Sequence, residues 1–180
     1  LSGVVDYLIW YARDADQAKY RRLFLHKTVG GEGATGYTKV ELADGTRRTL
    51  TPREREDTAL LPEGSRVFAT DNITSQNPGS RYDVGFRGRV FRPEPGYWKT
   101  DEVRMAKLLE ANRIECTANK LAYVRYFDDF PVFPLANVWS DTLGQNQFGG
   151  DKTYVVQTAL RVIERCLLMT TDPGDLVLDP

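Results

Sequence analysis

The sequence predicts an α+β protein, in which a mostly antiparallel, strand-rich middle is flanked by two pieces of an α/β sheet. Strand-like runs separated by turn residues fill the middle, at 38–50, 65–76, 81–92 and 113–127. A single long helical pattern, residues 99–113, lies among them. Dense apolar runs at 4–12 and 176–178 are typical of buried sheet strands.

Local sequence signals predict a strand, a hairpin turn and a helix start in the first half of the chain. Residues 4–12 read "VVDYLIWYA", and their β-branched and aromatic side chains predict a buried strand. Asp44 and Gly45, between two short strand patterns, predict a two-residue hairpin turn. Thr51 followed by Pro52 predicts the N-cap and first residue of a helix.

The second half adds two helices to this pattern. Thr100 is the predicted cap of the helix over 99–113, and Met105 belongs to its apolar face. An amphipathic helix is expected within 151–171. It leads through a turn to the apolar run 176–178, which gives an α-then-β order.

Composition narrows the classes of function. The 180 residues carry a formal net charge of −1, so any nucleic-acid binding must depend on local basic patches. No apolar run is long enough to cross a membrane and no secretory signal is visible, which predicts a cytoplasmic protein. His26 is the only histidine, and Cys116 and Cys166 lie far apart, so we expect neither a metal site nor a catalytic triad.

Three segments resemble one enzyme family. The tail "VVQTALRVIERCLLMTTDPGDLVLDP" is similar to the stretch of β-class amino DNA methyltransferases that precedes the S-adenosylmethionine loop. Near the start, "VVDYLIWYARD" resembles a late catalytic-domain strand of that family, and "NVWSDT", residues 137–142, resembles its Asp-x-Trp element. The three segments follow the family's order. The matching positions are Asp6, Tyr7, Tyr11, Arg13, Gln157, Glu164, Arg165, Pro173, Gly174, Asp175, Asp179 and Pro180, whereas Thr158 and Ala159 replace the usual Lys and Pro.

The resemblance implies three parts: residues 1–25 as the end of a catalytic-domain segment, 26–136 as a target recognition domain, and 137–180 as a return segment. It implies a parent enzyme that methylates an exocyclic amine of double-stranded DNA, with adenine N6 as first choice and cytosine N4 as second. S-adenosylmethionine is then the parent's methyl donor. The candidate cofactor-binding residues are Gln157, Thr158, Asp179 and Pro180.

The family's catalytic motif, Asp/Ser/Asn-Pro-Pro-aromatic, does not occur in this sequence. We therefore assign no catalytic residue here and expect the chain alone to be inactive and to bind the cofactor poorly. We interpret it as a fragment whose terminal strands the remainder of the methyltransferase would cover. In the fragment alone we expect these strands to pair with each other, to form a homodimer or to be poorly ordered.

Arginines and polar residues of the middle region are the candidate DNA contacts. In "RYDVGFRGRVFR", residues 81–92, Arg87 and Arg89 are two apart and are expected to share one face of a strand, with Phe86 and Val90 on the other. Such a row suits phosphates or guanine edges. The full set of candidates is Arg81, Arg87, Arg89, Arg92, Ser75 and Gln76.

A second interpretation stays open. The same residues suit a structural or protein-interaction insertion of an unrelated α/β enzyme, in which the arginines form a solvated sheet face. "GEGATG", residues 31–36, matches a dinucleotide-binding pattern, but a hairpin pattern follows it instead of a helix, so we expect a loop. Asp128 and Asp129 are expected to face opposite sides of a strand and not to share a metal.

Overall fold

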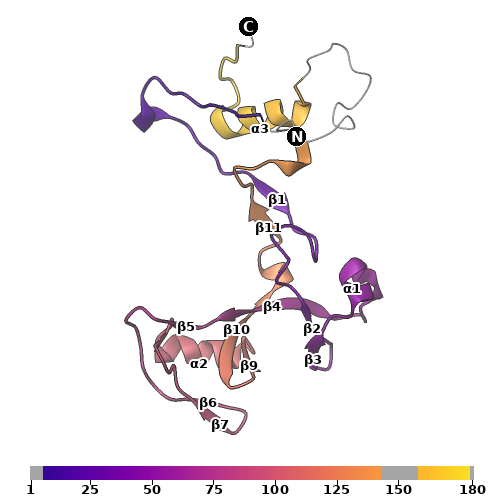
Figure 1. The fold of residues 1–180 in the computed structure, drawn as a ribbon, viewed down its shortest axis with the longest axis vertical. Coiled ribbons are helices and arrows are strands. Elements are labelled where there is room, and N and C mark those ends of the chain that lie inside the picture. Colours follow the sequence, from indigo (N-terminus) through magenta and orange to yellow (C-terminus); the bar gives the residue numbers. More distant parts are fainter. Residues whose placement is uncertain (1–5, 143–157, 179–180) are drawn as a thin grey trace, which may run out of the picture. The chain divides into compact units, whose positions relative to one another are not determined.

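A computed structural model describes residues 6–142 and 158–178. These residues combine helices with antiparallel sheets, in agreement with the predicted α+β class (Figure 1). Two compact units are present. Residues 26–133 make one, which we call the middle unit, and the described parts of 1–25 and 134–180 make the other, which we call the flanking unit.

The boundaries between the two units fall within a two-stranded sheet. Strand β1 (Phe24–His26) pairs with β11 (Val132–Pro134). The amide of Lys27 donates to the carbonyl of Pro131 at 2.9 Å. The boundary after Phe133 lies slightly before the division that the sequence suggested after residue 136.

A five-stranded antiparallel sheet forms the centre of the middle unit, with strand order β3-β2-β4-β10-β9. The longest pairing joins β4 to β10, from Phe68 opposite Tyr126 to Asn72 opposite Ala122. The strand bounds are β2 Lys39–Glu41, β3 Arg47–Thr49, β4 Arg66–Asn72, β9 Ile114–Thr117 and β10 Lys120–Tyr126.

The β2–β3 hairpin lies where the sequence predicted it, but its loop has three residues, 43–45, and the prediction of a two-residue turn was wrong. The Leu42 amide donates to the Thr46 carbonyl at 2.8 Å, and the Gly45 amide donates to the Leu42 carbonyl at 2.9 Å. Gly45 has φ +82°, a left-handed conformation that suits glycine, and the Asp44 carboxylate accepts from the amide of Thr46 at 2.8 Å. The β9–β10 hairpin occupies the strand-like run predicted at 113–127. Residues 31–36 form turns, and the β2–β3 hairpin follows them, as expected.

Two helices of the middle unit have well-defined caps. Helix α1 (Pro52–Glu56) begins with the predicted Thr51 in a capping box, because the Glu54 carboxylate also accepts from the Thr51 amide at 2.8 Å. Helix α2 (Glu102–Glu110) is capped by Asp101, whose carboxylate accepts from the Arg104 amide at 2.8 Å. The prediction of Thr100 as its cap was wrong by one residue.

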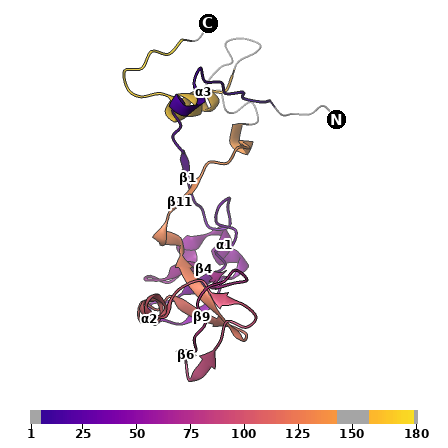
Figure 2. The same cartoon turned by 90° about the vertical axis from the view of Figure 1, so that its left-hand side faces the viewer.

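The larger core of the middle unit lies where α2 packs against β9 and β10 (Figures 1 and 2). Met105, Ile114 and Leu121 meet there, each at most 3% exposed. Trp98 belongs to strand β8 (Tyr97–Trp98), which pairs with β5 (Thr74–Ser75), and is 2% exposed. Its indole N–H donates to the carbonyl of Tyr82 at 2.9 Å. Trp98 is therefore an anchor of this core.

The side chain of Arg47 bridges the two edge strands, β3 and β9, of the five-stranded sheet. Strands β3 and β9 lie at opposite edges, which four spacings of about 4.8 Å would separate by about 19 Å in a flat sheet. Yet Arg47 of β3 donates to the carbonyl of Ile114 and the carboxylate of Glu115 in β9, both at 3.0 Å. The sheet is therefore strongly curled, and a side chain that is only 7% exposed joins its edges.

The flanking unit contains helix α3 (Leu160–Thr170). This helix confirms the amphipathic helix that the sequence predicted within residues 151–171. The first segment of the chain contacts the turn after α3. Lys19 forms ion pairs with Asp172 at 2.8 Å and Asp175 at 2.6 Å, and Arg21 pairs with Asp172. These contacts hold the described parts of the two flanks in one unit.

The two predicted end strands are not formed. Residues 6–12 and 176–178 have no strand structure, and Tyr7 and Leu176 are 85% and 97% exposed. An extended apolar run becomes a sheet strand only when neighbouring strands pair with its backbone. Within the described chain, no other strand pairs with either run.

Candidate nucleic-acid interface

The predicted arginine strand is in fact a hairpin. Strands β6 (Val84–Phe86) and β7 (Arg89–Phe91) pair with each other, and Arg87 and Gly88 form the turn. Both turn residues have positive φ, +48° and +74°, which is the signature of a type I′ turn. The expectation that Arg87 and Arg89 share one face of a continuous strand was therefore wrong.

The hairpin has one buried and one open face. Val84 lies opposite Phe91, and both are buried in the core, at 4% and 6% exposure. Gly85 lies opposite Val90 on the other face, where Val90 is 67% exposed. Phe86 packs against the core as expected, but the core placement of Val90 was wrong, because the turn reverses the chain between them.

Arg87 and Arg89 both lie at the turn end of this hairpin. The Arg89 guanidinium donates to the Asn119 side-chain carbonyl at 3.2 Å, in the β9–β10 turn. Arg87, 61% exposed, lies 3.7 Å from the Glu115 carboxylate. Because Glu115 is already bound by Arg47, it offsets little of the positive charge here. We call Arg87, Arg89 and Asn119 the tip group.

Arg92 does not join the tip group. Its guanidinium forms two hydrogen bonds with the Asp83 carboxylate, at 2.7 and 2.9 Å. These bonds lower the pKa of Asp83 and raise the pKa of Arg92, so both groups stay charged. The charge of Arg92 is thus matched inside the unit.

The other three candidates gather beside strands β5 and β8. The Arg81 guanidinium lies over the ring of Tyr97, 4.4 Å from its centroid. The Gln76 amide donates to the carbonyl of Pro95 at 3.4 Å, and Ser75 lies opposite Tyr97 in the β5–β8 pair. We call Ser75, Gln76 and Arg81 the second polar group.

The candidate cofactor residues fall largely outside the described residues. Gln157, Asp179 and Pro180 do so entirely. Thr158 is described and is exposed just before α3. One exposed hydroxyl does not make a cofactor site, so the described residues offer no fit for S-adenosylmethionine.

An ion-pair cluster in the flanking unit joins two of the segments that carry the family resemblance. Asp141 lies in the short 3₁₀ helix η4 (Ser140–Thr142) and accepts two hydrogen bonds from Arg165, at 2.8 and 2.6 Å. The side chain of Arg165 is only 6% exposed, and its guanidinium lies 5.1 Å from the centroid of the Trp139 ring. Hydrogen bonds from Arg165 lower the pKa of Asp141. Sequence reasoning named both segments but not this pairing.

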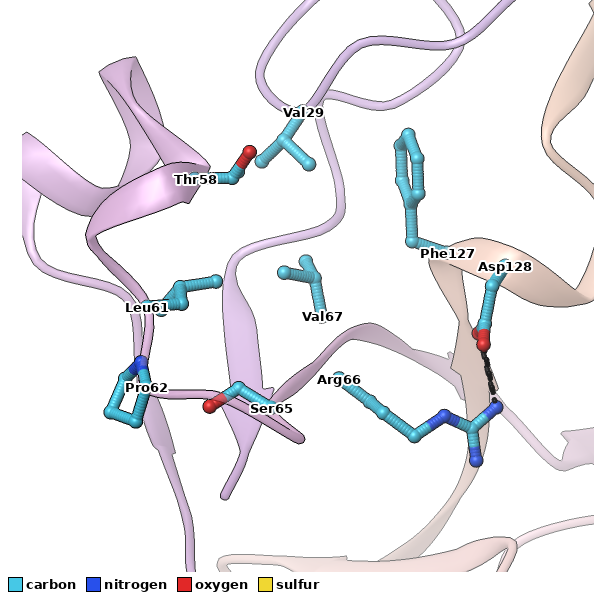
Figure 3. A pocket seen from close by; sticks show the side chains of 9 residues that line it. All are labelled: Val29, Thr58, Leu61, Pro62, Ser65, Arg66, Val67, Phe127 and Asp128. Atoms are coloured by element: carbon cyan, nitrogen blue, oxygen red, sulfur yellow. Dashed lines mark hydrogen bonds and ion pairs between the residues drawn. The ribbon is translucent and has the colours of Figure 1, made fainter. Parts of the chain in front are cut away.

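A cavity of about 320 Å³ lies elsewhere in the middle unit, among β4, η2 (Thr58–Leu60) and η3 (Phe127–Asp129). Figure 3 shows the apolar side chains of Leu61, Val67 and Phe127 around it, with Arg66 at one side bound to Asp128. The hydroxyl of Ser65 is buried there without a hydrogen-bond partner. With its one arginine paired, the cavity is not a phosphate site.

Asp128 and Asp129 lie in η3 and not in a strand. The expectation that the two side chains face opposite sides of a strand was therefore wrong. Asp128 binds Arg66 at 3.0 Å, and Asp129 binds Arg113 at 2.5 Å. Across 6–142 and 158–178, no three His, Cys, Asp or Glu side chains gather to hold a metal ion. Over the same ranges, no helix has both the length and the apolar character to span a membrane.

Comparison with known proteins adds no relative: no family model, no curated protein and no solved structure matches this chain.

Proposed function

We propose that the chain is the DNA-binding, target-recognising part of a site-specific DNA methyltransferase, which transfers methyl from S-adenosylmethionine to an exocyclic amine, adenine N6 in first place. The observation that carries the proposal is the Asp141–Arg165 pair. Two segments that resemble the same family, 137–142 and 155–180, meet in one ion pair, in which the Arg165 side chain is 6% exposed and the Asp141 side chain 38%. Family likeness and side-chain geometry thus favour the same grouping.

In this proposal the middle unit binds double-stranded DNA. The tip group offers two exposed guanidinium groups, which suit phosphates and guanine edges. The second polar group adds an arginine, an amide and a hydroxyl, which suit phosphates and adenine. The base is methylated after it leaves the helical stack, in a pocket that the proposal assigns to the rest of the enzyme.

The cofactor belongs to the parent enzyme in this proposal. S-adenosylmethionine supplies the methyl group, and no residue of the described chain acts on it. We expect this chain alone to dock DNA without transferring methyl groups.

The alternative is a protein-interaction insertion of an unrelated α/β enzyme. The exposed apolar residues near the start favour it, since Tyr7, Ile9 and Tyr11 are each at least 73% exposed. On this alternative the segment docks against a protein surface, and the arginines have no ligand.

Titration of labelled duplex DNA at two salt concentrations separates the two functions. DNA docking predicts that log K falls with log salt by about 0.9 for each phosphate contacted. Charge reversal of Arg87 and Arg89 together is expected to weaken binding more than the same reversal of the exposed Arg53 and Arg55 on α1. Absent or salt-independent binding favours the alternative.

The gene itself tests the parent enzyme. The proposal predicts a glycine-rich loop in the codons that follow Pro180, and Asp-Pro-Pro-Tyr or a related motif in the codons upstream of Leu1. Flanking sequence with neither feature contradicts the methyltransferase assignment.

A further inference from the structure

The β6–β7 hairpin contains two residues that are locally unfavourable and that packing does not explain. Gly85 occupies the middle of β6, where glycine is poorer than a residue with a side chain. A Cβ built at Gly85 meets no atom within 4 Å, and its φ is not in the left-handed region. Neither steric crowding nor backbone conformation therefore requires a glycine here.

Arg87 is the second such residue. It occupies the first position of a type I′ turn at φ +48°, where Asn, Asp or Gly is favoured and a long side chain is strained. Its only ion-pair partner in the described structure is Glu115, at a long 3.7 Å. The Arg87 guanidinium also lies 5.1 Å from the centroid of the neighbouring Phe86 ring. One long ion pair and one exposed cation–π contact are weak compensation for an arginine at a position that favours Asn, Asp or Gly.

Locally unfavourable residues with weak internal compensation are expected at functional sites. A glycine on an open strand face allows another backbone to approach closely. On the same face, the exposed Val90 lies directly opposite Gly85 and offers an apolar contact. Arg87 at the turn offers a guanidinium on a side chain that is 61% exposed, and the hairpin lies at the edge of the middle unit in both views (Figures 1 and 2).

We propose that the β6–β7 hairpin enters the major groove of DNA, with the Gly85–Val90 face against the groove wall and Arg87 at a guanine edge. This inference rests on the proposed DNA-binding function. A two-stranded ribbon fits the major groove, which is about 12 Å wide and about 8.5 Å deep. Three residues of strand extend about 10 Å, enough to bring the turn to the base edges. Val90 suits a thymine methyl group, and the positive tip group suits the negative groove.

The test uses the full chain and a pool of random-sequence DNA duplexes. Gly85→Val fills the open face with a good strand former, and Arg87→Asn installs a residue that the turn prefers. Both variants are expected to unfold at the wild-type temperature or above. Each is nevertheless expected to bind duplex DNA about tenfold more weakly. Gly36→Val is the matched control, because Gly36 is equally open and lies in a distant loop, and it is expected to bind like wild type.

A second duplex pool with 7-deazaguanine in place of guanine identifies the groove, because it removes the N7 acceptor of the major-groove edge. We expect it to weaken binding of the wild type but not of Arg87→Asn. Should the wild type bind while Gly85→Val, Gly85→Ala and Arg87→Asn bind equally well, the hairpin inference is overturned and the DNA-binding function stands. If the wild type binds no duplex at all, the proposed DNA-binding function is contradicted, and the hairpin inference with it. If Gly85→Val does not fold, the DNA affinities of Gly85→Ala and Arg87→Asn decide whether the hairpin inference holds.

Discussion

Replacing Arg47 with Met tests how the curled sheet is held closed. Each of the five N–H groups of Arg47 has an acceptor, and the side chain links β3 to Glu41 in β2 and to Glu115 in β9. Methionine fills similar space but donates no hydrogen bond. The substitution therefore leaves the carboxylates of Glu41 and Glu115, which are 14% and 12% exposed, without Arg47, and Glu115 keeps only its longer contact of 3.7 Å with Arg87.

The expected loss follows from what these carboxylates retain. Removing one partner of a buried ion pair costs about 3–5 kcal/mol. Glu41 still accepts from the Tyr126 hydroxyl at 2.9 Å, and Glu115 still accepts from the Cys116 amide at 3.2 Å. We therefore expect the free energy of unfolding of the middle unit to fall by about 3 kcal/mol, at the lower end of this range.

Urea unfolding of the full chain, with hydrogen exchange of the β4 and β10 amides as readout, measures this loss in the middle unit itself. Arg47→Lys keeps the charge but has fewer donors and is expected to lose less. Arg53→Met, on the exposed side of α1, serves as control and should change stability by no more than about 0.5 kcal/mol. An Arg47→Met variant as stable as this control refutes the role of Arg47 in joining the sheet edges.

Three further predictions concern stability. Asp141→Asn leaves the guanidinium of Arg165 without its carboxylate and is expected to destabilise α3 by about 1.5 kcal/mol, seen as faster amide exchange. Hydrogen bonds from Arg48 hold the pKa of Glu54 at about 2, below its ordinary 4.5, so their stabilisation is full above pH 4.5 and is lost as the pH falls towards 2. Urea midpoints at neutral and acid pH are expected to differ less in Glu54→Gln than in wild type. Phe68→Ala removes a fully buried ring and is expected to cost about 3–5 kcal/mol in the same urea assay.

Each of these predictions has an outcome that contradicts it. Unchanged α3 exchange in Asp141→Asn means that the ion pair does not hold the helix. If the urea midpoint of Glu54→Gln falls in acid as much as that of the wild type, carboxylates other than Glu54 cause the loss of stability in acid. A Phe68→Ala variant that loses less than about 1 kcal/mol places Phe68 outside the packed core.

Features with local causes were predicted from the sequence. The position of the hairpin loop around Asp44 and Gly45, though not its length, the Thr51 cap and the helix around Met105 each depend on residues within a few positions of one another. The cap of α2 was misplaced by one residue because Thr100 and Asp101 are adjacent and both are good caps.

Features with distant causes were not predicted. The turn at Arg87 and Gly88 was read as strand, because arginine is not a usual residue at the first position of a type I′ turn, and Val90 was consequently placed on the wrong face. Asp141 and Arg165 lie in different elements, and no spacing rule connects them. The apolar runs at the ends were predicted as buried strands, but residues 6–12 and 176–178 are exposed and form no strand, because strand formation depends on pairing that composition does not reveal.

Selection of binding sites from a random duplex pool tests most directly whether residues 26–133 read DNA sequence. The proposed function predicts that the wild-type chain enriches a short common motif, and that Arg87→Asn loses preference at a guanine within it. Recovery of duplexes with no shared sequence, or of none above background, contradicts a recognition role for this unit.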